Sequence, residues 1–350
     1  MTEPTSRQRR WPATAVATWR TFWFRPQPAY TLGLIRMAFG AVAICWAVSL
    51  LPDLYALFGR HGVEPQQPES AYQWSVFAIW TSNHVLLIGW ILLLVSSVAL
   101  TIGWHSRLAA LAVFVLILSF EHRDVWVFNS GDLAVRIEAL FLAISPCGAA
   151  LSLDQVRSAG KFWSAQQRPQ WPVRLMQVQL SLIYLASAQA KLNGNAWPQG
   201  TAVSYALRLP DMLLLPTPHW FTTSALLMNA VTWGTLAVEL SVGILVWNRR
   251  LRPWVLAAGV VMHTMIMITI AVGFFTLAVF VLYLAFVPPD IVERLPRSAK
   301  DMASKLVAAL ARPRTKSRNQ NENSDSTGDD GVVAEFRAES PSGAGATAED

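Results

Sequence analysis

The chain has 350 residues, of which 53% are hydrophobic and 14% are charged, whereas soluble domains carry about 25% charged residues. It contains 16 tryptophans, a residue type that gathers where proteins meet the membrane interface. These values exclude an ordinary soluble domain and indicate a multi-pass membrane protein. The net charge of +6 is therefore a signal of membrane orientation, and we expect no nucleic-acid partner.

The segment 1–30 is polar and holds five arginines interleaved with Trp and Phe residues. This pattern is typical of a helix that lies along a membrane surface with its aromatic rings at the interface. No short apolar run with a small-residue cleavage site follows the basic residues. We therefore expect a basic and aromatic cytoplasmic segment, no cleaved signal peptide, and a first apolar segment that stays in the membrane.

Apolar segments of the length that suits a membrane helix follow along the chain, since a crossing helix needs about 20 apolar residues. They span 31–51, 84–103, 107–121, 132–151, 173–191, 223–247, 254–271 and 274–288. The last two form one run that is too long for a single crossing, and it is broken near Gly273, where a re-entrant turn or a tight hairpin is expected. The sequence thus predicts an all-α, polytopic transmembrane bundle of about eight spans over residues 31–288.

Loops rich in Lys and Arg alternate with poor ones. The rich segments are the N-terminus, the turn at Arg107, the loops 152–172 and 248–253, and the residues after Pro288. Because basic loops stay on the cytoplasmic side, this alternation predicts a protein of the cell's inner (cytoplasmic) membrane with both termini inside. Seven spans would instead place the basic C-terminal segment outside.

The C-terminal part of the chain changes character after residue 288. Residues 289–312 have the pattern of a short amphipathic helix on the cytoplasmic face. Residues 313–350 are rich in Ser, Gly, Asn, Asp and Glu and hold almost no large apolar side chains. We expect this tail to be disordered, because it cannot bury enough apolar surface to fold.

Several ionisable residues fall inside the predicted spans, where they are costly and point to function by default. They are Arg36, Asp132, Arg136, Glu138, Lys191, Glu239 and His263. Depth counted along each helix, at about 1.5 Å per residue, places Arg36 and Glu239 nearer the cytoplasm, and we interpret them as a structural ion pair. Asp132 and Arg136 are four residues apart and can pair on one helix face. With Lys191 and His122 they are expected to share an outward-opening cavity above His263.

The segment at 173–191 carries a polar stripe, because Gln177, Tyr184 and Lys191 are seven residues apart and Ser187 lies beside them. Lys191 has three readings: it reaches outward to headgroups, pairs with Asp132, or acts as a base. His263 is either a neutral core histidine or a proton relay, and no clustered ligands favour a metal. The cysteines Cys45 and Cys147 are interpreted as small buried apolar residues.

Taken together, several stretches resemble the vitamin K-dependent γ-carboxylase family and its short bacterial relatives, the HTTM (horizontally transferred transmembrane) domain proteins. These stretches are "LGLIRMAFG" (32–40), "LYALFGRHGVEP" (54–65), "VFNSGDLAVR" (127–136), "YLASAQAKLNGNAWPQG" (184–200), "ELSVG" (239–243) and "HTMIMITIAVGFF" (263–275). Their order and spacing match over roughly residues 15–290. Each stretch alone is weak evidence, but the set is fairly specific.

The resemblance implies roles for individual residues. In the carboxylase, the lysine before the leucine deprotonates vitamin K hydroquinone, and that lysine falls on Lys191; the later histidine of the family falls on His263. With Tyr184 they are our candidate catalytic residues. The candidate substrate-binding residues are Asn129, Asp132, Arg136, Gln177 and Trp197.

This sequence also departs from the carboxylase pattern. It has Ala190 where the family has a second lysine, and Ile266 where the family has asparagine. The large lumenal domain that binds the protein substrate has no counterpart, so we do not expect carboxylation of protein glutamates. An isoprenoid quinol is the ligand that the resemblance suggests.

Three hypotheses remain open from the sequence. In the first, the chain is a membrane enzyme that binds a quinol-like lipid in an outward-facing pocket. In the second, it is a non-catalytic scaffold or partner subunit, whose protein partner the sequence does not name. In the third, it is a transporter, although no inverted repeat is visible. Membrane lipids are the partners common to all three.

Overall fold

The computed structural model describes residues 10–63, 74–80 and 82–295, with side chains from residue 14 onward. The chain divides into the units 1–299 and 300–350, and the second lies outside the described residues. The disordered tail predicted at 313–350, and residues 296–312 of the expected amphipathic helix, therefore also lie outside them. The first part of that helix, Pro289–Leu295, is helical.

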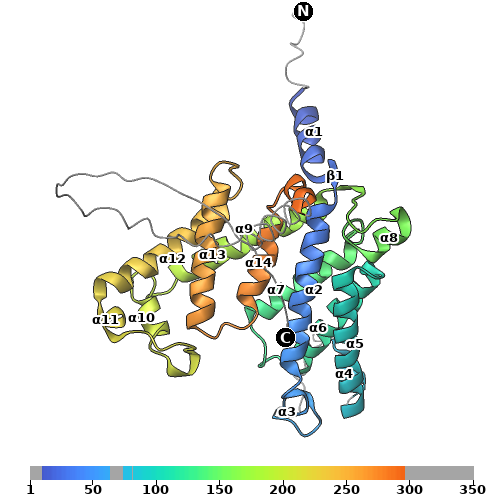
Figure 1. The fold of residues 1–350 in the computed structure, drawn as a ribbon. Helices are drawn as coiled ribbons and strands as arrows, with labels where there is room; N and C mark the ends of the chain where they lie inside the picture. Colours follow the sequence, from blue (N-terminus) through green and yellow to red (C-terminus); the bar gives the residue numbers. More distant parts are fainter. Residues whose placement is uncertain (1–9, 64–73, 81, 296–350) are drawn as a thin grey trace, which may run out of the picture. The chain divides into compact units, whose positions relative to one another are not determined.

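Eight helices form where the sequence predicts eight apolar segments, because a backbone in hydrocarbon must satisfy its own hydrogen bonds. They are α2 (Tyr30–Leu50), α5 (Asn83–Ile102), α6 (Ser106–Arg123), α7 (Ser130–Ile144), α9 (Trp171–Leu192), α12 (Ala225–Leu245), α13 (Arg252–Thr269) and α14 (Phe275–Leu284) (Figure 1).

Not all eight helices meet the requirements for crossing a membrane alone. Among the described residues, α2, α5, α12 and α13 are long and apolar enough, and α14 with Pro289–Leu295 adds a fifth span if that pair, bent by 99°, counts as one. The 10 residues of α14 extend only about 15 Å along the helix axis, half of a hydrocarbon core. The structure is therefore a helical membrane fold with four to five candidate spans.

Further elements precede or connect these helices. They are α1 (Arg10–Phe24), α3 (Leu54–Phe58), α4 (Val76–Ile79), α8 (Leu153–Ala159), α10 (Ala202–Ala206), the 3₁₀ helix η1 (Pro210–Met212), α11 (His219–Thr223), and the strands β1 (Pro26–Pro28) and β2 (Gln167–Pro169). The strands pair antiparallel with Pro26 opposite Pro169. This small sheet, which the sequence did not predict, fastens the end of the N-terminal segment to the loop before α9.

The helix α14 joins two groups of helices. One group contains α2, α5, α6 and α7, and the other contains α9, α12 and α13; α14 contacts α2 and α7 on one side and α9 and α13 on the other (Figure 1). The buried apolar side chains of both groups form one continuous core. Small residues allow the close crossings: a Cβ atom on Gly40 would lie 2.9 Å from Cα of Thr101, where α2 meets α5.

The predicted break near Gly273 is confirmed. α13 ends at Thr269 and α14 begins at Phe275, and Gly273 adopts a φ of +59°, which glycine tolerates without a Cβ penalty. The extended backbone at Ile270 pairs with Leu213 in an isolated bridge. Because the freed backbone groups bond to a neighbouring segment, an irregular stretch is tolerated here.

Loops from distant parts of the chain meet at the two ends of the bundle. At one end, Ala29 donates its N–H to Gln166, and the N–H of Asp154 bonds to Gly103. At the other end, Arg123 donates to the carbonyl of Phe58. The first end, which we call the basic end, gathers segments that contain or adjoin arginine: β1 (beside Arg25), the α5–α6 turn, α8, β2, the α12–α13 turn and the residues after α14 (Figure 1).

Candidate functional site

The polar stripe of α9 makes two groups of contacts. One is centred on Tyr184 and the other on Lys191, about two turns further along the helix. Tyr184 is buried, and Lys191 lies in the last turn of the helix with its side chain 22% exposed. Ser187 lies between them. Helix α9 continues to Leu192, after which Asn193 and Gly194 form a turn, so the sequence itself ends the helix just beyond the lysine.

Lys191 forms an ion pair with Glu239 in the interior of α12. Its ammonium also donates to Oγ of Ser187 at 3.1 Å and lies 4.8 Å from the centre of the Trp197 ring, a distance suited to a cation–π contact. The predicted pairing of Arg36 with Glu239 is therefore wrong, and so is the reading of Asp132 as the partner of Lys191. Oε2 of Glu239 is buried without a hydrogen-bond partner among the described residues.

About two turns before Lys191 on α9, Tyr184 meets polar side chains of two other helices in the core. The Tyr184 hydroxyl lies 2.8 Å from Nε2 of His263 on α13, and it also contacts the Tyr283 hydroxyl on α14. His263 is buried, with the rings of Phe275 and Phe280 around it. In the tautomer protonated on Nδ1, Nε2 accepts from Tyr184, which in turn accepts from Tyr283; in the other tautomer Nε2 donates to Tyr184. In either tautomer Nδ1 has no partner in the described part of the chain.

These two groups form one polar cluster between four helices, which we call the Lys191–His263 cluster. Its members are Tyr184, Ser187, Lys191, Glu239, His263 and Tyr283. Sequence reasoning identified the first three and His263, but it missed Tyr283 and gave Glu239 the wrong partner. Its hydroxyl, one of two in the apolar run of α14, was the only signal for Tyr283. Gln177 does not join the cluster: it donates to the carbonyl of Ala285 at 2.7 Å.

Arg36 has a structural role elsewhere. Its side chain is fully buried and donates to the carbonyls of Leu100, Thr101 (2.9 Å) and Leu151 (2.5 Å). Leu100 and Thr101 lie in the last turn of α5, where unpaired carbonyls favour a cation. Arg36 thus ties α2 to the end of α5 and to the loop before α8.

Asp132, Asn129 and Arg136 also make contacts outside the cluster. Asp132 accepts from the indole of Trp46 and from the Asn129 N–H, both at 2.8 Å, and the Asn129 side chain accepts from Gly131. This reciprocal arrangement is a capping box at the start of α7. Arg136 pairs with Glu121 at 2.6 Å and contacts His122 at 3.1 Å. The predicted Asp132–Arg136 pair is therefore wrong.

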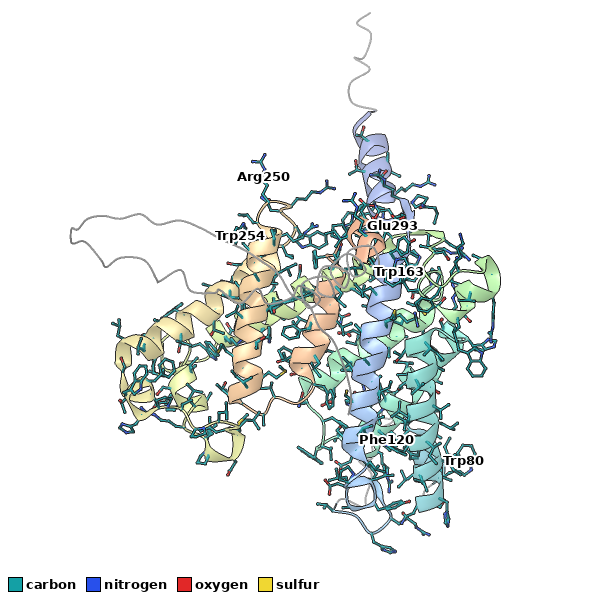
Figure 2. The ribbon with its side chains drawn as sticks, viewed as in Figure 1. Trp80, Phe120, Trp163, Arg250, Trp254 and Glu293 are labelled. Carbon is teal, nitrogen blue, oxygen red and sulfur yellow. The ribbon has the colours of Figure 1, made fainter. Side chains whose placement is uncertain are left out.

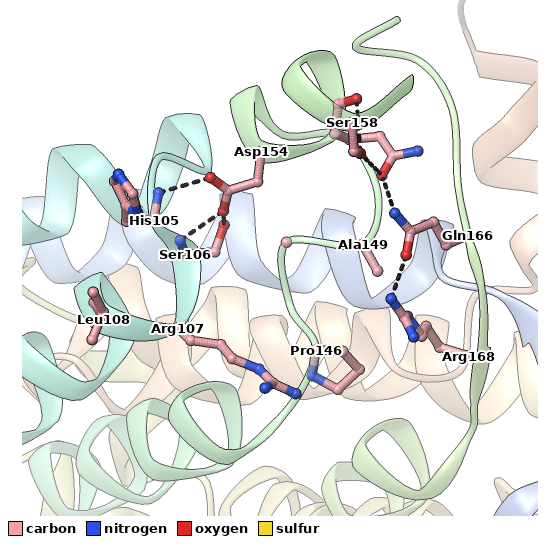
Figure 3. A pocket seen from close by; sticks show the side chains of 12 residues that line it. His105, Ser106, Arg107, Leu108, Pro146, Ala149, Asp154, Ser158, Gln166 and Arg168 are labelled. Carbon is pink, nitrogen blue, oxygen red and sulfur yellow. Dashed lines mark hydrogen bonds between the residues drawn. The ribbon is translucent and has the colours of Figure 1, made fainter. Parts of the chain in front are cut away.

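The two cavities described both lie at the basic end, away from Lys191. The smaller, of about 500 Å³, is lined by residues of the α5–α6 turn, the loop after α7, α8 and β2 (Figure 3). In it, Asp154 accepts from the N–H groups of His105 (2.9 Å) and Ser106 (2.8 Å) and from the Ser106 hydroxyl (2.7 Å). The carboxylate thereby caps the start of α6 from another segment.

Asp154 gives the folded chain a predictable pH dependence. Partial burial opposes its ionisation, but the donors of Ser106 and His105 outweigh that effect, so the pKa of Asp154 lies below its ordinary value. Its stabilising effect is complete above the ordinary pKa of about 3.9 and is lost as the pH falls through the lower pKa of the folded chain. Asp154→Asn is expected to lower the melting temperature in detergent at about pH 7, and by less toward about pH 3.

The matched control for this comparison is Asp53→Asn. The Asp53 side chain makes no cap hydrogen bond and is exposed, so its replacement should change the melting temperature little at either pH. A difference between Asp154→Asn and the parent chain that stays constant as the pH falls would contradict the assignment of Asp154 as an ionised cap.

Comparison with known proteins bears on the whole bundle. A family model described as HTTM domain matches residues 24–291, a range that contains every residue of the Lys191–His263 cluster. No curated protein and no solved structure matches the chain.

Proposed function

Because the chain belongs to the HTTM domain family and is a membrane protein of that family, we propose that it binds a quinol-like lipid at the Lys191–His263 cluster and removes a proton from it. The observation that carries this proposal is a pair of buried polar atoms, Oε2 of Glu239 and Nδ1 of His263, that have no partner among the described residues. Buried polar atoms without partners need an explanation, and a hydroxylated ring would supply one.

The ion pair changes the role that the proposal gives to Lys191: the Glu239 carboxylate, and not the amine, takes the substrate's proton. The substrate's O–H bond breaks, its proton passes to the Glu239 carboxylate, and the electron pair stays on the substrate oxygen. The Lys191 ammonium then stabilises the resulting anion, and the Trp197 ring beside Nζ offers a face for an aromatic ring. Tyr184 and His263, which are hydrogen-bonded to each other, orient the substrate at the cluster.

The proposal includes the orientation of the protein in the cell membrane. Eight spans with both termini in the cytoplasm agree with the alternation of basic loops. The gathering of those loops at one end of the bundle supports this orientation, which places residues 1–30, 289–312 and 313–350 inside. Lys191 then lies toward the outer face, where quinol would enter from the outer leaflet. The candidate residues Asn129, Asp132 and Arg136 would lie at that face and shape the entrance.

The experiment compares Lys191→Met and Glu239→Gln with the parent chain purified in detergent. Extracted quinone is quantified by its absorbance, and the rate of quinol oxidation in air is measured, because a quinol anion reacts readily with oxygen. Both variants are expected to lose activity by about 100-fold or more, the usual scale of general acid–base catalysis. Lys161→Met, an exposed lysine at the basic end, is the matched control. Unchanged turnover in folded Lys191→Met would overturn the proposal.

A second candidate function, a non-catalytic membrane scaffold, is favoured by one observation. Lys191 is already neutralised by a carboxylate within the bundle, and such pairs also hold helices together. If the scaffold reading holds, the double variant Lys191→Met/Glu239→Gln keeps its cellular phenotype, whereas loss of quinol content and phenotype together favours the enzyme.

A further inference from the structure

The larger cavity lies at the basic end, on the opposite side of the bundle from Lys191. It has a volume of about 1020 Å³ and is bounded by β1, the segment leading into α9, the α12–α13 turn and the residues after α14. Five arginines line it: Arg25, Arg168, Arg174, Arg249 and Arg252. We call it the arginine cavity.

The described part of the chain does not neutralise the positive charge of this cavity. Asp290 is the only acidic residue in its lining, and within the described ranges none of the five arginines forms an ion pair with a carboxylate. Arg249 and Arg252 lie near enough to Arg174 for their like charges to act on it. Holding such cations together costs free energy, which a bound anion would recover.

Two of the arginines are held in place with donors to spare. Arg174 donates to the carbonyl of Phe22 and to the side-chain oxygens of Gln170 and Gln177, which uses three of its five N–H groups. Arg252 donates from Nε to the carbonyl of Val246 at 3.0 Å, which leaves four. Guanidinium groups fixed in this way are suited to bind a phosphate through two parallel hydrogen bonds.

The rest of the lining is mixed, and its apolar part decides the kind of anion. Beside polar side chains, mostly glutamines, the cavity is lined by Leu32, Val173, Trp247, Leu256, Phe286 and Val287. A free phosphate has no use for these apolar side chains, whereas a membrane lipid combines a phosphate with hydrocarbon chains that they can contact. Basic pockets between membrane helices are known to bind anionic headgroups.

We propose that the arginine cavity binds the phosphate headgroup of an anionic membrane lipid. The phosphate lies among Arg174, Arg249 and Arg252, and the acyl chains leave past Trp247 and Phe286. Under the orientation proposed above, the lipid comes from the cytoplasmic leaflet, whose anionic lipids attract basic residues. The site does not depend on the chemistry at Lys191.

The test uses the full chain, purified and delipidated in a non-ionic detergent. Binding of short-chain phosphatidylglycerol is measured from the rise in melting temperature over a titration, beside short-chain phosphatidylcholine and inorganic phosphate. Phosphatidylglycerol is expected to bind at least ten-fold more tightly than either. Equal stabilisation by phosphatidylcholine would overturn the headgroup assignment, and equal stabilisation by inorganic phosphate would show a soluble-anion site instead of a lipid site.

Arginine variants locate the site. Arg249→Gln is expected to weaken binding of phosphatidylglycerol at least ten-fold without a folding defect, because Arg249 makes no side-chain hydrogen bond within the described ranges. Arg250→Gln is the matched control: this neighbour carries the same charge but does not line the cavity, and Figure 2 shows it pointing away at the tip of the α12–α13 turn. Equal affinity of Arg249→Gln and the parent chain would overturn the proposal. Lys191→Met should bind the lipid unchanged, which separates this site from the proposed function.

Discussion

Replacing Lys191 by methionine is expected to destabilise the folded chain by about 3 kcal/mol or more, the usual loss when one partner of a buried ion pair is removed. The variant leaves the Glu239 carboxylate, which is 7% exposed, without its counter-charge. Glu239→Gln should cost less, because the Lys191 side chain is 22% exposed and its ammonium can reach the interface. The free energy of unfolding is measured by titration of mixed micelles with a denaturing detergent.

The double variant Lys191→Met/Glu239→Gln completes the cycle. It removes both charges, so its loss should be smaller than that of Lys191→Met alone. Lys161→Met controls for the loss of a lysine as such. If the two single losses simply add in the double variant, Lys191 and Glu239 are not energetically coupled, and the pair is not what holds α9 to α12.

Arg36→Met is expected to have the second large effect and to lower the free energy of unfolding by about 3 kcal/mol or more. Three carbonyl groups, on Leu100, Thr101 and Leu151, lose a charged donor in the fully buried core, and each acceptor left unsatisfied costs about 1–3 kcal/mol. The unbranched methionine fills much of the vacated volume, so the loss reports on hydrogen bonding and not mainly on a void. The same detergent titration measures it.

Two further variants sharpen this result. Arg36→Lys should recover only part of the loss, because an ammonium does not match the planar fork of the guanidinium. Arg60→Met makes the same replacement at an exposed position and should change stability by less than about 0.5 kcal/mol. Comparable stability of Arg36→Met and Arg60→Met would contradict the role of Arg36 as the tie between α2 and α5.

The helices of the bundle were predictable because long apolar runs leave the backbone few alternatives. The break at Gly273 was predictable for a related reason: the run 254–288 exceeds the length of one crossing, and glycine tolerates a positive φ. The capping box of Asn129 and Asp132 also had a sequence signal, an Asn followed three residues later by an acid at a helix start. From the sequence we interpret the same two residues as candidates for substrate binding.

The ion pairs were not predictable, since depth was counted as though every helix stood upright in the membrane. Figure 1 shows α9 and α12 inclined to α2 and α13. An inclined helix changes depth more slowly along its length, so Glu239 meets Lys191 although simple counting places them in opposite halves. Likewise, Arg136 meets Glu121 because α6 and α7 pack as neighbours, a tertiary contact that residue spacing within α7 does not reveal.

The last turn of α14 belongs to two sites at once. Tyr283 reaches the Tyr184 hydroxyl in one direction, and the carbonyl of Ala285, two residues later, receives the amide of Gln177 at the wall of the arginine cavity. Both partners, Tyr184 and Gln177, belong to α9, so this single turn fastens α14 to α9 at two points about two helical turns apart, whether or not either site is occupied.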